Sequence, residues 1–142
     1  FGVTVMVEDF PVPALPMSTS DEMKALLDAA PGLQLILDTG NMLAQKEDPL
    51  HFYQALKGHY AHVHLKDIEY PENATTGDID CDGRHIWNAQ HGEGVVNFAA
   101  LLPDLKQDGF DGYVTVEYGP HEGTKDHFEK MAESIRYLEG LL

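Results

Sequence analysis

Hydrophobic and polar residues alternate along four separate stretches of the chain, a pattern typical of β-strands whose two faces have different environments. The stretches run from Val3 to Phe10, Leu33 to Thr39, Tyr60 to Ile68 and Gly112 to Tyr118. Each stretch precedes a segment in which apolar residues recur at helical spacing. Strands that alternate with helices in this way predict βαβ units and a parallel sheet.

The predicted helices have recognisable starts and stops. The first follows the N-capping hydroxyl groups of residues 18–20 and extends to Gly32. The other three are predicted at Pro49–Lys57, Asn97–Gln107 and Lys125–Leu141. Because Pro103 lies inside the third helix, we expect that helix to start late or to kink.

The two faces of each predicted strand differ in chemistry. One face is uniformly apolar, as with Leu33, Leu35 and Leu37, and suits packing against helices. The other face ends, at or near the carboxyl end of the strand, in a residue that can bind a metal. These residues are Glu8, Asp38, His64 and Glu117.

A single acidic residue at a strand end is usually solvated or caps a helix. Only the four residues together favour a metal site. The carboxyl ends of the strands build the active site of α/β barrels, and we expect the four side chains to meet there. Three carboxylates and one imidazole suit a divalent cation such as Mn²⁺, Mg²⁺, Co²⁺ or Zn²⁺, without choosing between them.

The composition is that of a globular protein and narrows the classes of partner. The chain has 142 residues, which we interpret as one domain over residues 1–142, and its net charge is −15. The nine Lys and Arg residues are scattered, which argues against nucleic-acid binding. No apolar run is long enough to span a membrane. A single cysteine, Cys81, excludes an internal disulfide and favours a cytoplasmic location.

Five segments in order carry a resemblance to a known family: VMVEDF, LILDTGN, HVHLKD, GEGVVNF and GFDGYVTVE. They resemble the sugar isomerase/epimerase superfamily with the xylose-isomerase-like TIM barrel. The likeness runs from Val3 to Leu142 and corresponds to strands five to eight, the C-terminal half of a (β/α)8 barrel. It implies that the four strand-end residues bind the metal, and that Glu8 and Glu117 also transfer protons beside a substrate carbonyl.

Three further residues are predicted to bind substrate. Asn41 stands where many members of the family have a substrate-holding histidine, and its amide can still bond a hydroxyl. Lys66 could contact a substrate hydroxyl or phosphate, or pair with Asp67 or another acidic residue. His62 lies one layer deeper than His64, where it would be an interior hydrogen-bonding residue or would orient His64.

The resemblance implies a divalent-metal-dependent isomerase or epimerase of a sugar, sugar phosphate or keto-polyol. The alternatives are a metal-dependent dehydratase of inosose-like or dehydroshikimate-like substrates, and a non-catalytic sugar-binding barrel. A nuclease of the endonuclease IV type is disfavoured by Asn41, which replaces a zinc-binding histidine, and by the negative charge.

Four strands leave open sheet edges, whereas a complete barrel has eight. We therefore expect an N-terminal half barrel or a second copy as partner, and the abrupt start suggests a piece of a longer protein. Residues 69–94 lack clear periodicity, and a loop of that length is usually functional or mobile. Within it, Trp87 would either stack on a sugar or anchor the loop.

Overall fold

A four-stranded parallel sheet forms the centre of the computed structural model, which describes residues 2–119 and 126–142. Its strands, in the spatial order β1-β2-β3-β7, are β1 (Met6–Glu8), β2 (Gln34–Asp38), β3 (Tyr60–Leu65) and β7 (Tyr113–Val116). The helices are α1 (Ser20–Ala29), α2 (Pro49–Ala55), α3 (Phe98–Gln107) and α4 (His127–Glu139). A short 3-10 helix, η1 (Asn41–Gln45), follows β2. The predicted βαβ units and parallel sheet are confirmed.

Local sequence explains where the first two helices begin. Thr19 and Glu22 form a capping box at α1, because the Thr19 hydroxyl accepts the Glu22 N–H and the Glu22 carboxylate accepts the Thr19 N–H. At α2 the Asp48 carboxylate caps the helix, and Pro49 occupies the first turn, where its missing N–H costs nothing.

The third helix starts within one residue of its predicted range, without the late start expected from Pro103. α3 starts at Phe98, because the Asn97 side chain accepts the Ala100 N–H, and it continues through Pro103. The expected late start is therefore wrong. The last helix begins at His127, and its predicted start at Lys125 lies outside the described residues. Within the described ranges, none of the helices combines the length and apolarity needed to cross a bilayer.

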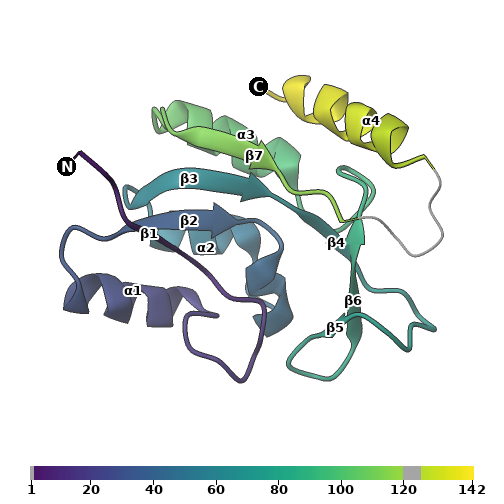
Figure 1. Cartoon of the computed structure of the whole chain (residues 1–142), viewed down its shortest axis with the longest axis horizontal. Helices are drawn as coiled ribbons and strands as arrows, with labels where there is room; N and C mark the ends of the chain where they lie inside the picture. Colours follow the sequence, from purple (N-terminus) through teal and green to yellow (C-terminus); the bar gives the residue numbers. More distant parts are fainter. Residues whose placement is uncertain (1, 120–125) are drawn as a thin grey trace.

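The hydrophobic core lies between the sheet and the helices that line one of its sides (Figure 1). The two central strands contribute buried apolar side chains to this core, with Leu35, Leu37, Val63 and Leu65 at 0–1% exposure. The helices contribute large side chains to the same core, among them Met23, Phe52, Phe98 and Leu101. The opposite side of the sheet carries the polar strand positions.

The edge strands differ from the prediction. The strand expected from Val3 begins only at Met6, where pairing with Gln34 of β2 starts. Val5 is 69% exposed, and Val114 of β7 is also exposed, so the expected apolar packing is wrong at these two positions. Val7 and Val116 do pack against the core, as expected. Because β1 and β7 each have a neighbouring strand on one side only, their outer apolar side chains have less to pack against.

A second, antiparallel sheet stands at the carboxyl ends of the main strands (Figure 1). It consists of β4 (Asp67–Glu69), β5 (Asp78–Ile79) and β6 (His85–Ala89) in the order β4-β6-β5. The strand predicted over residues 60–68 is therefore two strands, and the predicted loop over 69–94 contains two more. These strands have two to five residues each, too short for alternation to reveal them.

The break between β3 and β4 is held by the Asp67 side chain. Its buried carboxylate accepts the N–H groups of Gly92, Gly94 and Val96 at 2.9 to 3.1 Å, which fixes the segment that enters α3. A Cβ atom at Gly94 would lie 2.2 Å from Asp67 Oδ1, so this close approach requires glycine. Asp67 is thus committed to structure, whereas the preceding Lys66 extends toward the polar side of the sheet.

Candidate metal centre

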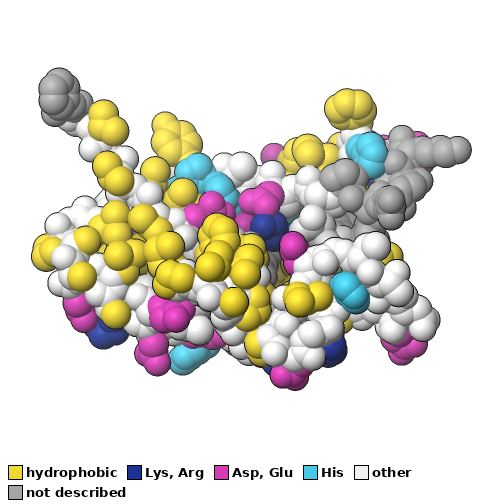
Figure 2. All heavy atoms as spheres, turned by 60° about the horizontal axis from the view of Figure 1, so that its bottom comes forward, with side chains coloured by type: hydrophobic (Ala, Val, Ile, Leu, Met, Phe, Trp, Pro, Cys, Tyr) yellow, Lys and Arg dark blue, Asp and Glu magenta, His cyan; other side chains and the backbone are white. Residues whose placement is uncertain are grey.

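The four residues predicted to bind a metal come together at the carboxyl ends of the four parallel strands. Each offers one ligand atom, and these atoms all lie within 4.8 Å of one another. Each of the four comes from a different strand or from the residue directly after it: Glu8 (β1), Asp38 (β2), His64 (β3) and Glu117 (β7). Figure 2 shows acidic and histidine side chains gathered around one basic side chain near the middle of the molecule. We call Glu8, Asp38, His64 and Glu117 together the carboxylate cluster.

His64 lies between the two glutamates. Its Nδ1 atom is 2.9 Å from Glu8 Oε1 and 3.4 Å from Glu117 Oε2. The imidazole comes from a central strand, and the glutamates come from the two edge strands, so carboxylates approach it from both sides. A metal ion at this point would receive ligands from across the full width of the sheet.

Asp38 is the most deeply buried member, with a side chain that is 0% exposed. Its Oδ1 atom accepts the N–H groups of Gly40 and Asn41 at 2.8 and 3.0 Å. Its buried Oδ2 atom accepts no hydrogen bond from the described residues, and its partner there is the Lys66 ammonium group, as an ion pair at 3.1 Å. Burial raises the pKa of the Asp38 carboxyl to about 6, against the opposing charge of Lys66. A buried carboxylate oxygen that accepts no hydrogen bond, together with the mixed carboxylate and imidazole set, fits a divalent cation.

Asp9 supports the cluster and was not identified from the sequence. Its buried Oδ1 atom accepts the Asp38 N–H at 3.0 Å, which ties the end of β1 to the end of β2. Burial, followed by the charge of Asp38, raises the pKa of Asp9 well above its usual value. The available signal was the pair of adjacent acids at positions 8 and 9, but strand parity favoured only Glu8 as a ligand.

Lys66 places its ammonium group inside the cluster. Nζ lies 3.1 Å from Asp38 Oδ2 and 2.5 Å from Glu117 Oε1, and it donates a hydrogen bond of 3.0 Å to Asn41 Oδ1. Of the two roles considered from sequence, pairing with acids is observed, although not with Asp67. Burial lowers the pKa of Lys66, but the charges of Asp38 and Glu117 outweigh it and the net change is upward. Burial likewise opposes, but does not prevent, a lowered pKa of Glu117 next to this ammonium group.

His62 contacts the cluster from below. Its ring meets the ring of His64 edge-on, with centroids 4.9 Å apart, and its Nε2 atom is 2.7 Å from Thr115 Oγ1. These contacts suit both interpretations of His62, as an interior hydrogen-bonding residue and as a residue that orients His64.

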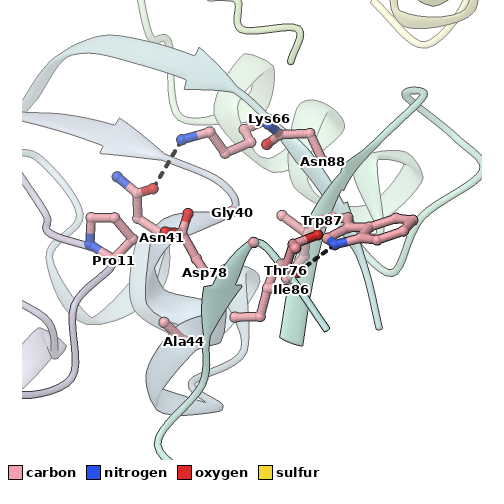
Figure 3. Close-up of a pocket in the computed structure, with 12 residues that line it drawn as sticks. Pro11, Gly40, Asn41, Ala44, Lys66, Thr76, Asp78, Ile86, Trp87 and Asn88 are labelled. Carbon is pink, nitrogen blue, oxygen red and sulfur yellow. Dashed lines mark hydrogen bonds between the residues drawn. The ribbon is translucent and has the colours of Figure 1, made fainter. Parts of the chain in front are cut away.

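A pocket of about 230 Å³ is lined by Lys66, which pairs with Asp38 and Glu117 of the cluster, and by Asn41, which accepts a hydrogen bond from Lys66. One wall comes from the antiparallel sheet, and in Figure 3 Asn88 lies next to Lys66 while Trp87 lies on the side of the pocket away from Asn41. The indole N–H of Trp87 donates to the Thr76 carbonyl at 2.7 Å. Trp87 therefore anchors its loop and also lines the pocket, so a stacking role stays open beside the anchoring one.

Comparison with known proteins identifies the fold family. The xylose isomerase-like TIM barrel family matches residues 1–141, and the chain belongs to that family. Among curated relatives, an inosose dehydratase of Lacticaseibacillus casei is 22% identical over 114 residues, covering 78% of this chain and 38% of the relative. An inosose dehydratase of Bacillus thuringiensis (strain Al Hakam) is 26% identical over 134 residues, covering 88% of this chain and 45% of the relative.

Solved structures show the same fold. A xylose isomerase domain protein from Planctomyces limnophilus aligns with a TM-score of 0.77 at 20% identity, covering 99% of this chain and 47% of that one. A 3-keto-D-glucoside 4-epimerase from E. coli has a TM-score of 0.69 at 19% identity, with 98% and 46% covered. A Mycobacterium smegmatis barrel protein in complex with magnesium has a TM-score of 0.72 at 16% identity, with 99% and 44% covered.

These matches confirm the predicted half of a TIM barrel. The chain spans less than half the length of each relative described above. Its four parallel strands are correspondingly half of the eight in a complete barrel.

Proposed function

We propose that the chain forms the metal-binding half of the active site of a divalent-metal-dependent isomerase or epimerase. Its substrate would be a sugar, sugar phosphate or keto-polyol. The observation that carries the proposal is the convergence of four ligand atoms within 4.8 Å at the carboxyl ends of four parallel strands. The resemblance to sugar-modifying enzymes, including a 3-keto-D-glucoside 4-epimerase, supports it.

The ion would be held by Glu8, Asp38, His64 and Glu117, and Mn²⁺, Mg²⁺, Co²⁺ and Zn²⁺ all suit this set. When bound, such an ion polarises a substrate carbonyl and so acidifies the neighbouring C–H group. The magnesium in the related M. smegmatis barrel supports the choice of a divalent cation.

The two glutamates are arranged for proton transfer. The Lys66 ammonium group lowers the pKa of Glu117, which keeps the carboxylate in the ionised form that a general base needs. Glu8 enters from the other edge of the sheet and would return a proton to the opposite face of the substrate carbon. Two carboxylates on either side of one point are what an epimerisation requires.

The remaining predicted residues would hold the substrate. Asn41 and Lys66 line the pocket next to the cluster, so their amide and ammonium groups would contact substrate hydroxyl groups. His62 would keep the ring of His64 in place through the edge-on contact.

A metal-dependent dehydratase is the second candidate, because the curated relatives described above are inosose dehydratases. Dehydration starts with the same removal of a proton beside a carbonyl and then expels a hydroxyl group. The Lys66 ammonium group, between the cluster and the pocket, is a donor of the kind that the departing hydroxyl needs.

The complete site would also need a partner for the open sheet. The proposed partner is an N-terminal half barrel or a second copy of the chain, as the exposed edge residues and the half-length matches suggest. The half barrel is the stronger candidate because the related chains are about twice as long.

Deuterium exchange tests the proposal and separates the two candidates. The chain, together with the proposed partner that completes the barrel, is incubated with Mn²⁺ and a panel of ketoses and inososes in D₂O. An isomerase or epimerase returns isomers that carry deuterium, whereas a dehydratase forms a product with ultraviolet absorbance from an enone or diketone. Glu8→Gln and Glu117→Gln should abolish either activity, and Glu139→Gln on the exposed end of α4 is the matched control.

The same experiment can reject both candidates. Binding of a sugar without exchange or turnover, and unchanged by the two glutamine variants, would leave the non-catalytic sugar-binding barrel as the function.

A further inference from the structure

Lys66 lines the pocket and pairs with two members of the carboxylate cluster, and among the described residues that line the pocket it is the one with a positive charge. Its Nζ atom contacts one oxygen each of Asp38, Glu117 and Asn41, at 3.1, 2.5 and 3.0 Å. The ammonium group, which can only donate, pairs with two carboxylates and donates a hydrogen bond to the Asn41 amide oxygen. The ammonium group thus takes up oxygen atoms from two of the four predicted metal ligands.

The path of the lysine side chain is built into the fold. A Cβ atom at Gly40 would lie 2.7 Å from Lys66 Cδ and 2.8 Å from Cγ. Gly40 has a φ of −106°, which any residue can adopt, so its glycine is required by the space that the lysine stem takes up.

The ends of the lysine residue are fixed as well. Thr39 Oγ1 accepts the Lys66 N–H at 2.8 Å and donates to the Lys66 carbonyl at 2.7 Å. Asn41 Nδ2 donates to the Asp9 carbonyl at 2.9 Å, which turns the amide oxygen toward Lys66. The side chain is therefore directed at the cluster and is not a surface lysine that happens to reach it.

Lys66 and a bound metal ion would compete for the same carboxylates. The cluster gathers three carboxylates beside one imidazole, and Lys66 compensates part of their repulsion. A divalent ion held by the cluster would draw on the carboxylates of Asp38 and Glu117, which are the ion-pair partners of the ammonium group. Two cations this close to the same carboxylates repel each other.

We propose that Lys66 is an internal counter-cation of the cluster, which a divalent metal ion displaces from Asp38 and Glu117 toward Asn41 and the pocket. The inference rests on the proposed metal-dependent function and adds a regulation of that site. Metal binding then has two linked effects: it completes the cluster, and it presents a cationic hydrogen-bond donor to the substrate. Substrate binding is accordingly stronger after the metal has bound.

Mn²⁺ titration of the chain, together with the proposed partner that completes the barrel, tests the proposal. Lys66→Met should bind Mn²⁺ at least about tenfold more tightly than the unsubstituted protein, because one close competing charge is removed. Its metal-free form should unfold at a lower temperature, and Mn²⁺ should raise that temperature by more than in the unsubstituted protein. Lys46→Met is the matched control, since Lys46 pairs with Asp82 away from the cluster. Lys66→Gln provides a polar neutral variant if Lys66→Met does not fold.

Three outcomes are distinguishable. Unchanged or weaker Mn²⁺ binding by both Lys66 variants, with binding that is lost in His64→Ala, overturns the counter-cation and leaves the proposed function intact. No Mn²⁺ binding by any variant overturns both. A crystal structure with Mn²⁺ in which Lys66 Nζ stays within 3.5 Å of Asp38 Oδ2 would also contradict the displacement.

Discussion

The central strands β2 and β3 and the edge strands β1 and β7 carry the same kind of sequence pattern but end in different environments. Leu37 in the centre is fully buried, whereas Val5 at one edge is 69% exposed. The site residues follow the same division: the Asp38 side chain is 0% exposed, and those of Glu8 and Glu117 are 35% and 39% exposed. The centre supplies a fixed scaffold, while the edges supply the groups proposed to move protons.

This division also explains what a half barrel lacks. The central strands have neighbours on both sides and helices beneath, so their burial depends on the described chain alone. The edge strands would gain their missing neighbours only from a partner half. Four comparisons between centre and edge test this picture, and they are given from the largest expected effect to the smallest.

Truncation of the core should separate the two kinds of strand most strongly. Leu37→Ala should lower the free energy of unfolding by about 2–5 kcal/mol, because it leaves a cavity beneath the sheet. Val5→Ala, a smaller truncation on an exposed edge residue, should change it by no more than about 0.5 kcal/mol. Urea denaturation measures both values. A cost for Val5→Ala well above that limit would mean that the edge is covered in the native assembly.

Loss of a predicted metal ligand on a central strand should weaken metal binding more than loss of one on an edge strand. His64→Ala should remove Mn²⁺ binding, because the His64 imidazole lies between the two glutamates, 2.9 Å from Glu8 Oε1 and 3.4 Å from Glu117 Oε2. Glu8→Gln, at an edge, keeps an oxygen that can bind and should weaken binding by about 10–100-fold, the range seen when a supporting group is lost. Isothermal titration measures both. Stronger binding by His64→Ala than by Glu8→Gln would reverse the proposed roles of centre and edge.

The stability of the folded protein should depend on pH through Asp9, which joins the end of edge strand β1 to the end of central strand β2. Burial raises the pKa of Asp9 in the folded protein, so the folded state holds this proton more tightly than the unfolded state does. Stability is therefore lost as the pH rises from the usual range of an aspartic acid through the raised value. Asp9→Asn cannot ionise and keeps an acceptor for the Asp38 N–H.

Thermal unfolding from pH 4 to pH 8 tests this expectation. The melting temperature of Asp9→Asn should be close to that of the unsubstituted protein at pH 4 and should exceed it increasingly toward pH 8. A constant difference across this range would show that Asp9 does not titrate between the folded and unfolded states.

The smallest effect is expected where β3 meets β7. Thr115→Val removes the contact with His62 Nε2 but keeps the shape of the side chain, so the free energy of unfolding should fall by at most about 1 kcal/mol. Mn²⁺ affinity should stay within about twofold if His62 is only an interior hydrogen-bonding residue. A loss of about tenfold or more would show that the contact orients His64.

Much of the fold follows from local patterns. The alternation in residues 33–39 predicts β2 closely, and that in residues 60–68 predicts β3 but runs three residues beyond its end at Leu65. The hydroxyl groups of residues 18–20 predict the start of α1. The antiparallel sheet was missed because strands as short as Asp78–Ile79 carry no measurable period. Val3 and Val5 were assigned to packed positions because alternation reports which face a residue takes, and not whether anything covers that face.

Strand parity alone placed the four acidic and imidazole side chains on one side of one sheet end, because successive side chains of a strand alternate and parallel strands end at the same edge. The sequence by itself therefore determined the class of fold and the members of the carboxylate cluster. Only the tertiary structure decided how their charges are balanced. The contacts of Lys66 with Asp38 and Glu117, and of Asp9 with the end of β2, join positions 25 or more residues apart. Their pKa shifts depend on burial and on distance in space, and neither is encoded in the spacing of residues along the chain.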